Sequence, residues 1–467
     1  MAGAGLVAQP GRLPRAEASQ GEYPAPWTAN GILVCCMVAY ALSLLDRQIL
    51  ALMVDPVRQD LGLSDFQIGL VQGLAFAIFY SILTIPCGRL ADRLSRKKLI
   101  AGGVIFWSTA TVCCGFATGF WSLFFARMCV GVGEAVLVPA AYSLLADSFR
   151  ADRLIRATAI FGFGALAGAG VAMLLGGVLV DQVAASPDPP FGLTGVAGWR
   201  IVFFIAGAPG FILGTLFLFL PEPSRKGAMQ NAAGEIVRPG LKETFGYLWR
   251  RRRIYAPIYA SPVLLGTIVY GAISWFPTFL VRNFGMSYTE VGLFAGLIQI
   301  GASFVGAIIG AVLGNYMIKK GHRDAHIRAL LIIAVAAIIP SVTATLFTDR
   351  TSMLAMWIVA QILLCSYLGV SMAALQLRTP NQMRALNSAL CMCLGALFGA
   401  GIGSAAISGI AQFVFEDEKA IGYGMSIVSA IFAPTATLLI WSGLKPHRED
   451  PFLYGDAAAS PEPVRGD

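Results

Sequence analysis

Apolar segments about 20 residues long recur along almost the whole chain, and they leave few folds open to it. A helix needs about 20 consecutive apolar residues to cross a hydrocarbon core roughly 30 Å thick. We count twelve such segments: 30–54, 65–91, 98–116, 121–148, 156–180, 200–220, 254–280, 288–318, 327–347, 352–376, 386–414 and 421–442. Only 13% of the residues are charged, about half the usual fraction in a soluble domain. The sequence therefore predicts an all-α membrane protein with twelve transmembrane helices.

Lys and Arg residues are distributed unevenly between the two sides of these segments. Few of the 34 fall on one side: Arg58, Arg200, Arg282, Arg350 and Lys419. Arg47 and Arg127 lie inside predicted helices, and all the others fall on the opposite side. Because cytoplasmic loops are enriched in Lys and Arg, we expect both termini to be cytoplasmic. No cleaved signal peptide is indicated, and we expect a multi-pass protein of a bacterial inner membrane.

A polar segment at 221–253 divides the predicted helices into two sets of six. The predicted halves are 30–220 and 254–445, and the expected cytoplasmic tails are 1–29 and 446–467. Two such halves with a substrate site between them at the bilayer midplane are a common plan for transporters.

Two stretches in equivalent places of these halves resemble each other. "LGLSDFQIGL" at 61–70 aligns with "FGMSYTEVGL" at 284–293, and Gly, Ser, Gly and the final Leu are preserved. This repeat indicates a duplicated unit. The polar segment itself ends in a helical pattern that predicts a helix lying along the membrane surface. Its apolar face would hold Leu241, Phe245, Leu248 and Trp249.

Four charged residues lie inside predicted helices of the first half: Asp46, Arg47, Arg127 and Glu134. Charged side chains in a membrane normally face protein or water. Arg127 and Glu134 share a helix face and are about 10 Å apart along it at 1.5 Å per residue. The same rise puts Asp46 at the depth of Arg127. If their two helices adjoin, we predict that these residues pair and that Glu134 is the deeper, less compensated acid.

Arg47 lies about 100° around its helix from Asp46. Contact with Glu134, with substrate or with a neighbouring helix is open to it. We expect Glu134 and Asp46 to serve proton coupling, with Arg127 and Arg47 as charge partners. A static network that only fixes helix packing is the alternative.

Ionisable groups are missing from the central turns of the predicted helices in the second half. That half therefore supplies polar and aromatic candidates for a substrate cavity: Tyr270, Trp275, Gln361, Tyr367 and Asn387. We find no nucleophile with a nearby base, no ligand set for a metal and no ATP-binding loop. We accordingly expect no enzyme activity, no catalytic residue, no metal, no cofactor and no nucleic-acid partner.

The stretch "GRLADRLSRKKL" at 88–99 resembles the signature loop of the major facilitator superfamily. Matching residues are Gly88, Leu90, Asp92, Arg93, Arg96 and Lys97, whereas Ser95 stands where Gly is usual. In that family the loop latches the halves together when the cavity opens outward. The resemblance implies the major facilitator fold over about 30–445, and we expect a monomer.

A narrower resemblance rests on the stretches around the four charges. "LLDRQILALM" and "FFARMCVGVGEAVLVP" are similar to the Spinster branch of that superfamily, whose animal members export lysosphingolipids and lysophospholipids. The expected function is proton-coupled secondary transport of an amphiphilic, lysolipid-like substrate by alternating access. Alternatives are a drug/proton antiporter, although Ala169 stands where that branch has Pro, an organic-anion symporter, and a non-transporting receptor on the same fold.

Overall fold

The structure, a computed structural model, describes residues 23–183, 195–225, 241–380 and 383–450, so most of the two predicted tails lies outside the described residues. All elements in these ranges are helical. Nine helices precede the central segment: α1 Pro26–Leu52, α2 Val54–Leu61, α3 Asp65–Gln72, α4 Leu74–Arg93, α5 Arg96–Cys114, α6 Phe120–Glu134, α7 Leu137–Ser148, α8 Ala151–Val183 and α9 Gly198–Phe219.

The α-helices that follow are α10 Leu241–Arg250, α11 Arg252–Ala260, α12 Gly266–Phe284, α13 Tyr288–Lys319, α14 Ala325–Thr343, α15 Arg350–Leu377, α16 Arg384–Leu394, α17 Gly403–Ile410, α18 Ile421–Ser442 and α19 Leu444–Glu449. Short π-helical and 3₁₀ segments connect several of them: η2 Ser261–Leu265, η3 Ala344–Leu346, η5 Gly395–Ile402, η6 Ala411–Phe415 and η7 Glu418–Ala420.

Ten helical segments of the described chain are long and apolar enough to cross a membrane: Pro26–Leu52, Asp65–Ala91, Phe120–Ser148, Gly198–Phe219, Arg252–Phe284, Tyr288–Lys319, Ala325–Leu346, Arg350–Leu377, Leu386–Phe415 and Glu418–Glu449. They coincide with ten of the predicted segments. The other two predicted segments, 98–116 and 156–180, fall on α5 and α8. α5 packs along α9 and α8 packs along α1, so both run beside apolar helices.

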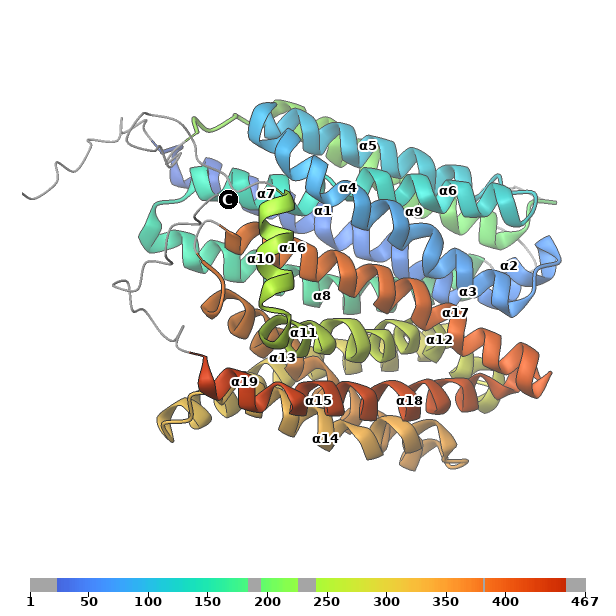
Figure 1. Cartoon of the computed structure of the whole chain (residues 1–467). Coiled ribbons are helices and arrows are strands. Elements are labelled where there is room, and N and C mark those ends of the chain that lie inside the picture. The colour runs from blue at the N-terminus through green and yellow to red at the C-terminus, as the bar shows by residue number, and fades with distance from the viewer. Residues whose placement is uncertain (1–22, 184–194, 226–240, 381–382, 451–467) are drawn as a thin grey trace, which may run out of the picture.

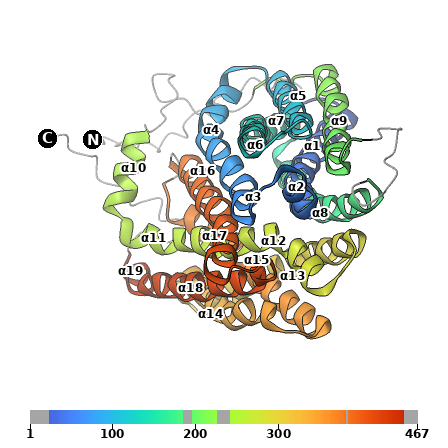
Figure 2. The same ribbon diagram turned by 90° about the vertical axis from the view of Figure 1, so that its right-hand side faces the viewer.

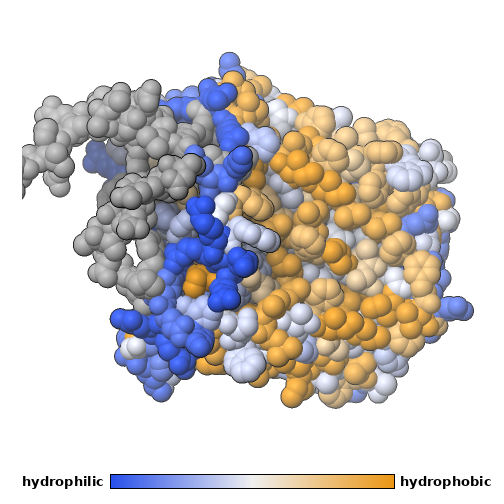
Figure 3. Space-filling model, viewed as in Figure 1, coloured by the Kyte–Doolittle hydropathy of each residue, from blue (hydrophilic) through white to orange (hydrophobic). Residues whose placement is uncertain are grey.

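Most helices run in one common direction, with α1 to α9 on one side of the molecule and α11 to α18 on the other (Figures 1 and 2). We call these sets the first and second helix groups. α10 crosses the common direction at one end, and α2 lies at the opposite end (Figure 1). These ends are named the α10 end and the α2 end. Hydrophobic residues cover the side of the molecule between them (Figure 3), as expected of a surface that faces lipid.

Glycines bring the two groups into backbone contact. A Cβ atom added at Gly292 of α13 would lie 2.5 Å from the carbonyl oxygen of Met173 in α8. One at Gly296 would lie 2.6 Å from the carbonyl oxygen of Gly170. Real Cβ atoms do not approach that closely, so side chains here would separate α8 from α13. Small residues allow membrane helices this close approach.

The predicted repeat has a clear structural meaning. Gly62 and Gly285 both adopt φ of 62° and end α2 and α12 in the left-handed conformation that glycine tolerates best. Two residues later, Ser64 and Ser287 cap α3 and α13 with capping boxes completed by the residues at the third helical position, Gln67 and Glu290. The preserved letters therefore mark a helix stop followed by a helix start.

Candidate functional site

Arg47 and Glu134 form a buried ion pair between α1 and α6. The Arg47 Nη2 atom lies 2.5 Å from the Glu134 Oε2 atom, and the Arg47 Nε atom donates to the same oxygen at 2.7 Å. The Ser43 hydroxyl donates to that oxygen as well, at 3.1 Å. The Glu134 side chain is 0% exposed, whereas the Arg47 side chain is 25% exposed. The sequence left contact with Glu134, with substrate or with a neighbouring helix open for Arg47. The structure shows the contact with Glu134.

The predicted ion pair between the side chains of Asp46 and Arg127 does not form. Arg127 Nη1 instead donates to the main-chain carbonyl of Asp46 at 2.8 Å. The Asp46 carboxylate accepts a hydrogen bond from the Thr111 hydroxyl at 3.0 Å, and its Oδ1 atom has no hydrogen-bond partner. The equal depth of Asp46 and Arg127 correctly indicated that these residues are in contact. Depth alone does not determine whether Arg127 meets the carboxylate or the main-chain carbonyl of Asp46. Glu134, predicted as the less compensated acid, carries the direct arginine partner.

Two aromatic rings lie beside the guanidinium group of Arg47. Its guanidinium carbon lies 4.3 Å from the centre of the Phe76 ring and 4.9 Å from that of Tyr80, within the range of cation–π contacts. The Phe76 and Tyr80 rings are stacked, with their centres 5.0 Å apart. Both residues belong to α4. One cation of α1 and two stacked aromatic rings of α4 therefore lie together.

The break between α6 and α7 fixes the position of Glu134, which is the last residue of α6. We predicted a single segment over 121–148. Pro139 has no N–H to donate to the carbonyl four residues earlier, and its ring crowds that position, which accounts for a helix ending just before it. Gly131 allows α6 to lie against α4, because a Cβ there would be 2.6 Å from the carbonyl oxygen of Phe76.

Arg96 is the centre of the contacts made by the signature loop. It is 1% exposed, forms an ion pair with Asp147 of α7, and donates to the Glu222 carboxylate at 2.8 Å. Lys97 donates its main-chain N–H to the same carboxylate and its Nζ atom to the Leu220 carbonyl. Burial raises the pKa of Glu222, but the hydrogen bonds from Arg96, the Lys97 amide and Ser95 lower it by a larger amount. The pKa of this carboxyl therefore lies below the usual value for Glu.

The partners of Arg96 and Lys97 all belong to the part of the chain that precedes α10. Gly88 lies against Pro139, since a Cβ there would be 3.7 Å from the proline Cβ. Arg93 is exposed, and the side chain of Asp92 lies outside the description.

The five cavity candidates of the second half differ in their contacts. Trp275 donates to the Ser404 carbonyl at 2.9 Å, and the Asn387 amide donates to the Thr379 hydroxyl at 2.7 Å, so both are held by protein groups. Tyr367 is buried with 5% of its surface exposed. Tyr270 is 43% exposed, and buried Gln361 has an Oε1 atom without a hydrogen-bond partner. Tyr270 and Gln361 are therefore the two with unused contact surface.

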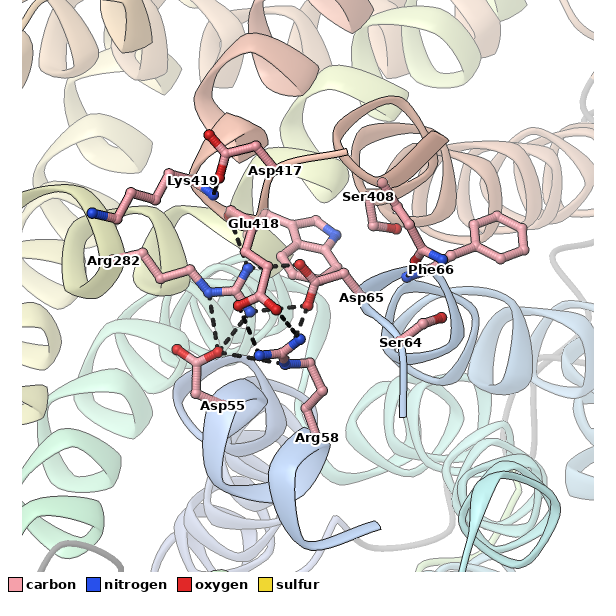
Figure 4. A network of polar contacts seen from close by, with 12 residues as sticks. Asp55, Arg58, Ser64, Asp65, Phe66, Arg282, Ser408, Asp417, Glu418 and Lys419 are labelled. Carbon is pink, nitrogen blue, oxygen red and sulfur yellow. Dashed lines mark hydrogen bonds and ion pairs between the residues drawn. The ribbon is translucent and has the colours of Figure 1, made fainter. Parts of the chain in front are cut away.

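A second charged site, at the α2 end, joins the two helix groups. Arg282 of α12 contacts Asp55 of α2 and Asp65 of α3, each with a shortest distance of 2.6 Å. Arg58 of α2 forms a two-pronged pair with Glu418, at 2.5 and 2.7 Å. Figure 4 shows the two guanidinium groups side by side among the three carboxylates. We call these five residues the outer charge cluster.

This cluster is not among the sites predicted from the sequence, although Asp55 and Arg58 precede the first copy of the repeat and Asp65 lies within it. A usable signal was present. Arg58, Arg282 and Lys419 belong to the few cations on the side of the membrane that has few Lys and Arg residues. Acidic residues lie close in sequence to Arg58 and to Lys419.

Comparisons with known proteins agree with this architecture. A "MFS-type efflux pump" of Mycolicibacterium smegmatis is 27% identical over 432 residues, 91% of this chain and 94% of that protein. The "Sphingosine-1-phosphate transporter SPNS2" of Xenopus tropicalis is 27% identical over 308 residues, 65% of this chain and 56% of that protein. A bacterial homologue of the human lysosomal transporter Spinster, solved in an inward-facing, unoccupied conformation, superposes with a TM-score of 0.78 at 23% identity, covering 91% of this chain and 100% of that one.

The last comparison shows a shared fold, in line with the resemblance to the Spinster branch predicted from the sequence. The match to a family covers most of the chain. Residues 36–404 match the Major Facilitator Superfamily, and the chain is therefore a multi-pass membrane transporter that belongs to this superfamily and is similar to Spinster proteins.

Proposed function

We propose that this protein is a proton-coupled secondary transporter that moves an amphiphilic, lysolipid-like substrate by alternating access. The observation that carries the proposal is the Arg47–Glu134 pair, whose cation is partly exposed beside Phe76 and Tyr80. A guanidinium group binds phosphate or carboxylate well, and the aromatic rings offer an apolar surface for a chain. The similarity to the sphingosine-1-phosphate transporter of Xenopus tropicalis supports this class of substrate.

The coupling follows from competition for Arg47. While Glu134 is ionised, it holds the guanidinium through two hydrogen bonds. Protonation of Glu134 removes the negative charge and releases Arg47 for an anionic head group. Proton binding and anion binding therefore favour each other, and this coupling is reciprocal. Asp46, with a free carboxylate oxygen beside Thr111, is the second acid for proton transfer, and Arg127 positions it through its main-chain carbonyl.

The wider architecture in this proposal has twelve spans in two halves, 30–220 and 254–445, joined by the central loop at 221–253. The repeated helix stop and start at Gly62 and Gly285 supports the duplication. The excess of Lys and Arg at the α10 end supports cytoplasmic termini in a bacterial inner membrane. We propose a monomer, and a loop at Gly88, Asp92, Arg93, Arg96 and Lys97 that closes the cytoplasmic side when the α2 end opens.

Transport measurements in liposomes test the coupling. The purified chain should move a fluorescent lysophospholipid faster when a pH gradient is imposed. Glu134→Gln, which mimics the protonated acid, should abolish the effect of the gradient while keeping binding. Glu449→Gln is the matched control, because Glu449 is 64% exposed and pairs only loosely with Lys445, at 4.0 Å. Full gradient-driven transport by Glu134→Gln would move the coupling to Asp46 or exclude proton coupling.

The efflux pump of Mycolicibacterium smegmatis favours a second candidate, drug/proton antiport. The two functions predict opposite effects of pH on binding. An anionic amphiphile should bind more tightly in acid, because protonated Glu134 releases Arg47. A cationic drug should bind more weakly in acid, because it needs the ionised carboxylate. Binding of lysolipids, sugar acids and cationic drugs, each measured at two pH values, would separate these classes.

A further inference from the structure

Four consecutive arginines, 250–253, lie at the corner where α10 meets α11. α10 crosses the direction of the spans there, and Figure 3 shows a hydrophilic band at this end beside the hydrophobic side of the molecule. The arginines line an open hollow of about 430 Å³ together with Ile254, Pro446 and Asp450. The proposed transport mechanism uses none of these residues.

The hollow carries an excess of positive charge. Among the described residues that line it, the acid is Asp450. Its side chain is 3% exposed and already binds two cations, Arg251 at 2.5 Å and Arg378 at 2.8 Å. In the described part of the chain, no carboxylate lies within 4.0 Å of Arg250, Arg252 or Arg253, and all three are exposed. Guanidinium groups with free donors at a membrane surface suit a phosphate group, which can accept two parallel hydrogen bonds from one arginine.

An apolar surface adjoins these charges. Phe245 and Trp249 of α10 are 61% and 67% exposed, and their spacing of four residues puts them on one helix face. The neighbouring Tyr247 and Leu248 pack against the core of the second helix group. α10 is therefore fixed to the protein on one side and presents two aromatic rings on another. Exposed aromatics beside arginines are typical of a helix at the boundary between head groups and acyl chains.

We propose that the hollow at Arg250–Arg253 binds the head-group phosphate of an anionic diacyl phospholipid, with Phe245 and Trp249 against its acyl chains. This lipid is a bound component of the surrounding leaflet and is distinct from the transported substrate. Arg250, Arg252 and Arg253 supply the donors. Arg251 anchors the site, because it links α10 to Asp450 and, through Asp450, to Arg378 at the end of α15.

Native mass spectrometry of the full chain, purified with phosphatidylglycerol or phosphatidylcholine, tests the proposal. The wild type should retain phosphatidylglycerol in preference to phosphatidylcholine. Arg250→Gln/Arg253→Gln should weaken retention about 30-fold, or about 2 kcal/mol, at roughly 1 kcal/mol per arginine near the surface. Lys319→Gln/Lys320→Gln is the control, since it removes two exposed cations from the same end of the molecule. An equal loss in both variants would overturn the site, because general surface charge would then explain the binding.

Two further measurements distinguish a phospholipid bound at this hollow from free phosphate and from a lipid bound in the transport cavity. Trp249→Ser should weaken retention of phosphatidylglycerol, whereas inorganic phosphate should not displace the lipid at millimolar concentration. Displacement by phosphate together with an unaffected Trp249→Ser variant would overturn the assignment to a lipid. Glu134→Gln should keep phosphatidylglycerol. Its loss from that variant would assign the bound lipid to the transport cavity instead.

Discussion

Removing Arg282 should open the α2 end of the molecule. Its guanidinium group is the main bridge from α12 to Asp55 and Asp65, and it also donates to the Glu418 carbonyl at 3.0 Å. Arg282→Gln keeps a polar side chain but removes the charge. Asp65, with a side chain 6% exposed, would keep only Arg58 as a distant partner, at 3.8 Å.

The size of the effect follows from the burial of these groups. Breaking a buried ion pair by removing one partner costs about 3–5 kcal/mol. Asp55 and Arg58 are each 19% exposed, and Arg58 still compensates part of the acidic charge, so we take the lower end, about 3 kcal/mol. At 1.4 kcal/mol per factor of ten, this shifts the balance between closed and open α2 ends about 100-fold. A closed state favoured by about 99 to 1 would then become roughly half populated.

Electron–electron distance measurements between spin labels can detect this shift. Labels at Gln59 of α2 and Thr289 of α13, both exposed, report the separation of the two groups at the α2 end. Arg282→Gln should add a population at longer distance. Arg350→Gln is the control, because Arg350 pairs at 3.6 Å with Glu290 of its own group and is 40% exposed. An unchanged distance distribution in Arg282→Gln would refute the view that the cluster holds the α2 end closed.

Two further predictions concern packing and acid sensitivity. Gly292→Leu should separate α8 from α13 and abolish transport. Gly301→Leu on the same helix should have little effect, because no atom lies within 4 Å of the Cβ position there. Equal transport by both variants would contradict the packing argument. Glu222→Gln should lower the melting temperature at pH 7, because a carboxylate with a lowered pKa stabilises the fold above its unfolded pKa of about 4.3. This effect should fade as pH falls through the folded pKa, which lies below the unfolded one. A destabilisation that is independent of pH would assign the role of Glu222 to packing alone.

Ten of the twelve predicted spans match long apolar helices of the described chain, and these spans and the repeat could be predicted because their causes are local. Hydrophobic length determines a span, and the Gly-x-Ser spacing at Gly62 and Gly285 determines a helix stop and a new start. The buried charges were found for the same reason, since their cost in lipid does not depend on the rest of the fold.

The pairing of these charges could not be predicted so well. Rise per residue gives the depth of Asp46 and Arg127, but not the rotation of α1 relative to α6, and this rotation turns Arg47 toward Glu134. The outer charge cluster needs even more information. Its members come from α2, α3, α12 and the segment before α18, which meet only when both helix groups are in place.

The interior pair and the outer charge cluster belong to one short piece of chain, and this links their behaviour. α1, which carries Arg47, ends at Leu52, and α2, which carries Asp55, begins at Val54 after a single break at Met53. When Arg282 releases Asp55, the Arg58–Glu418 pair is the remaining ion pair from α2 to the second helix group among the described residues. The adjoining end of α1 is then held less firmly against α6. The Arg47–Glu134 pair spans that same α1–α6 contact. Opening at the α2 end therefore biases the pair that we propose binds the proton, and protonation of Glu134 biases the opening in return, as linkage between two sites requires.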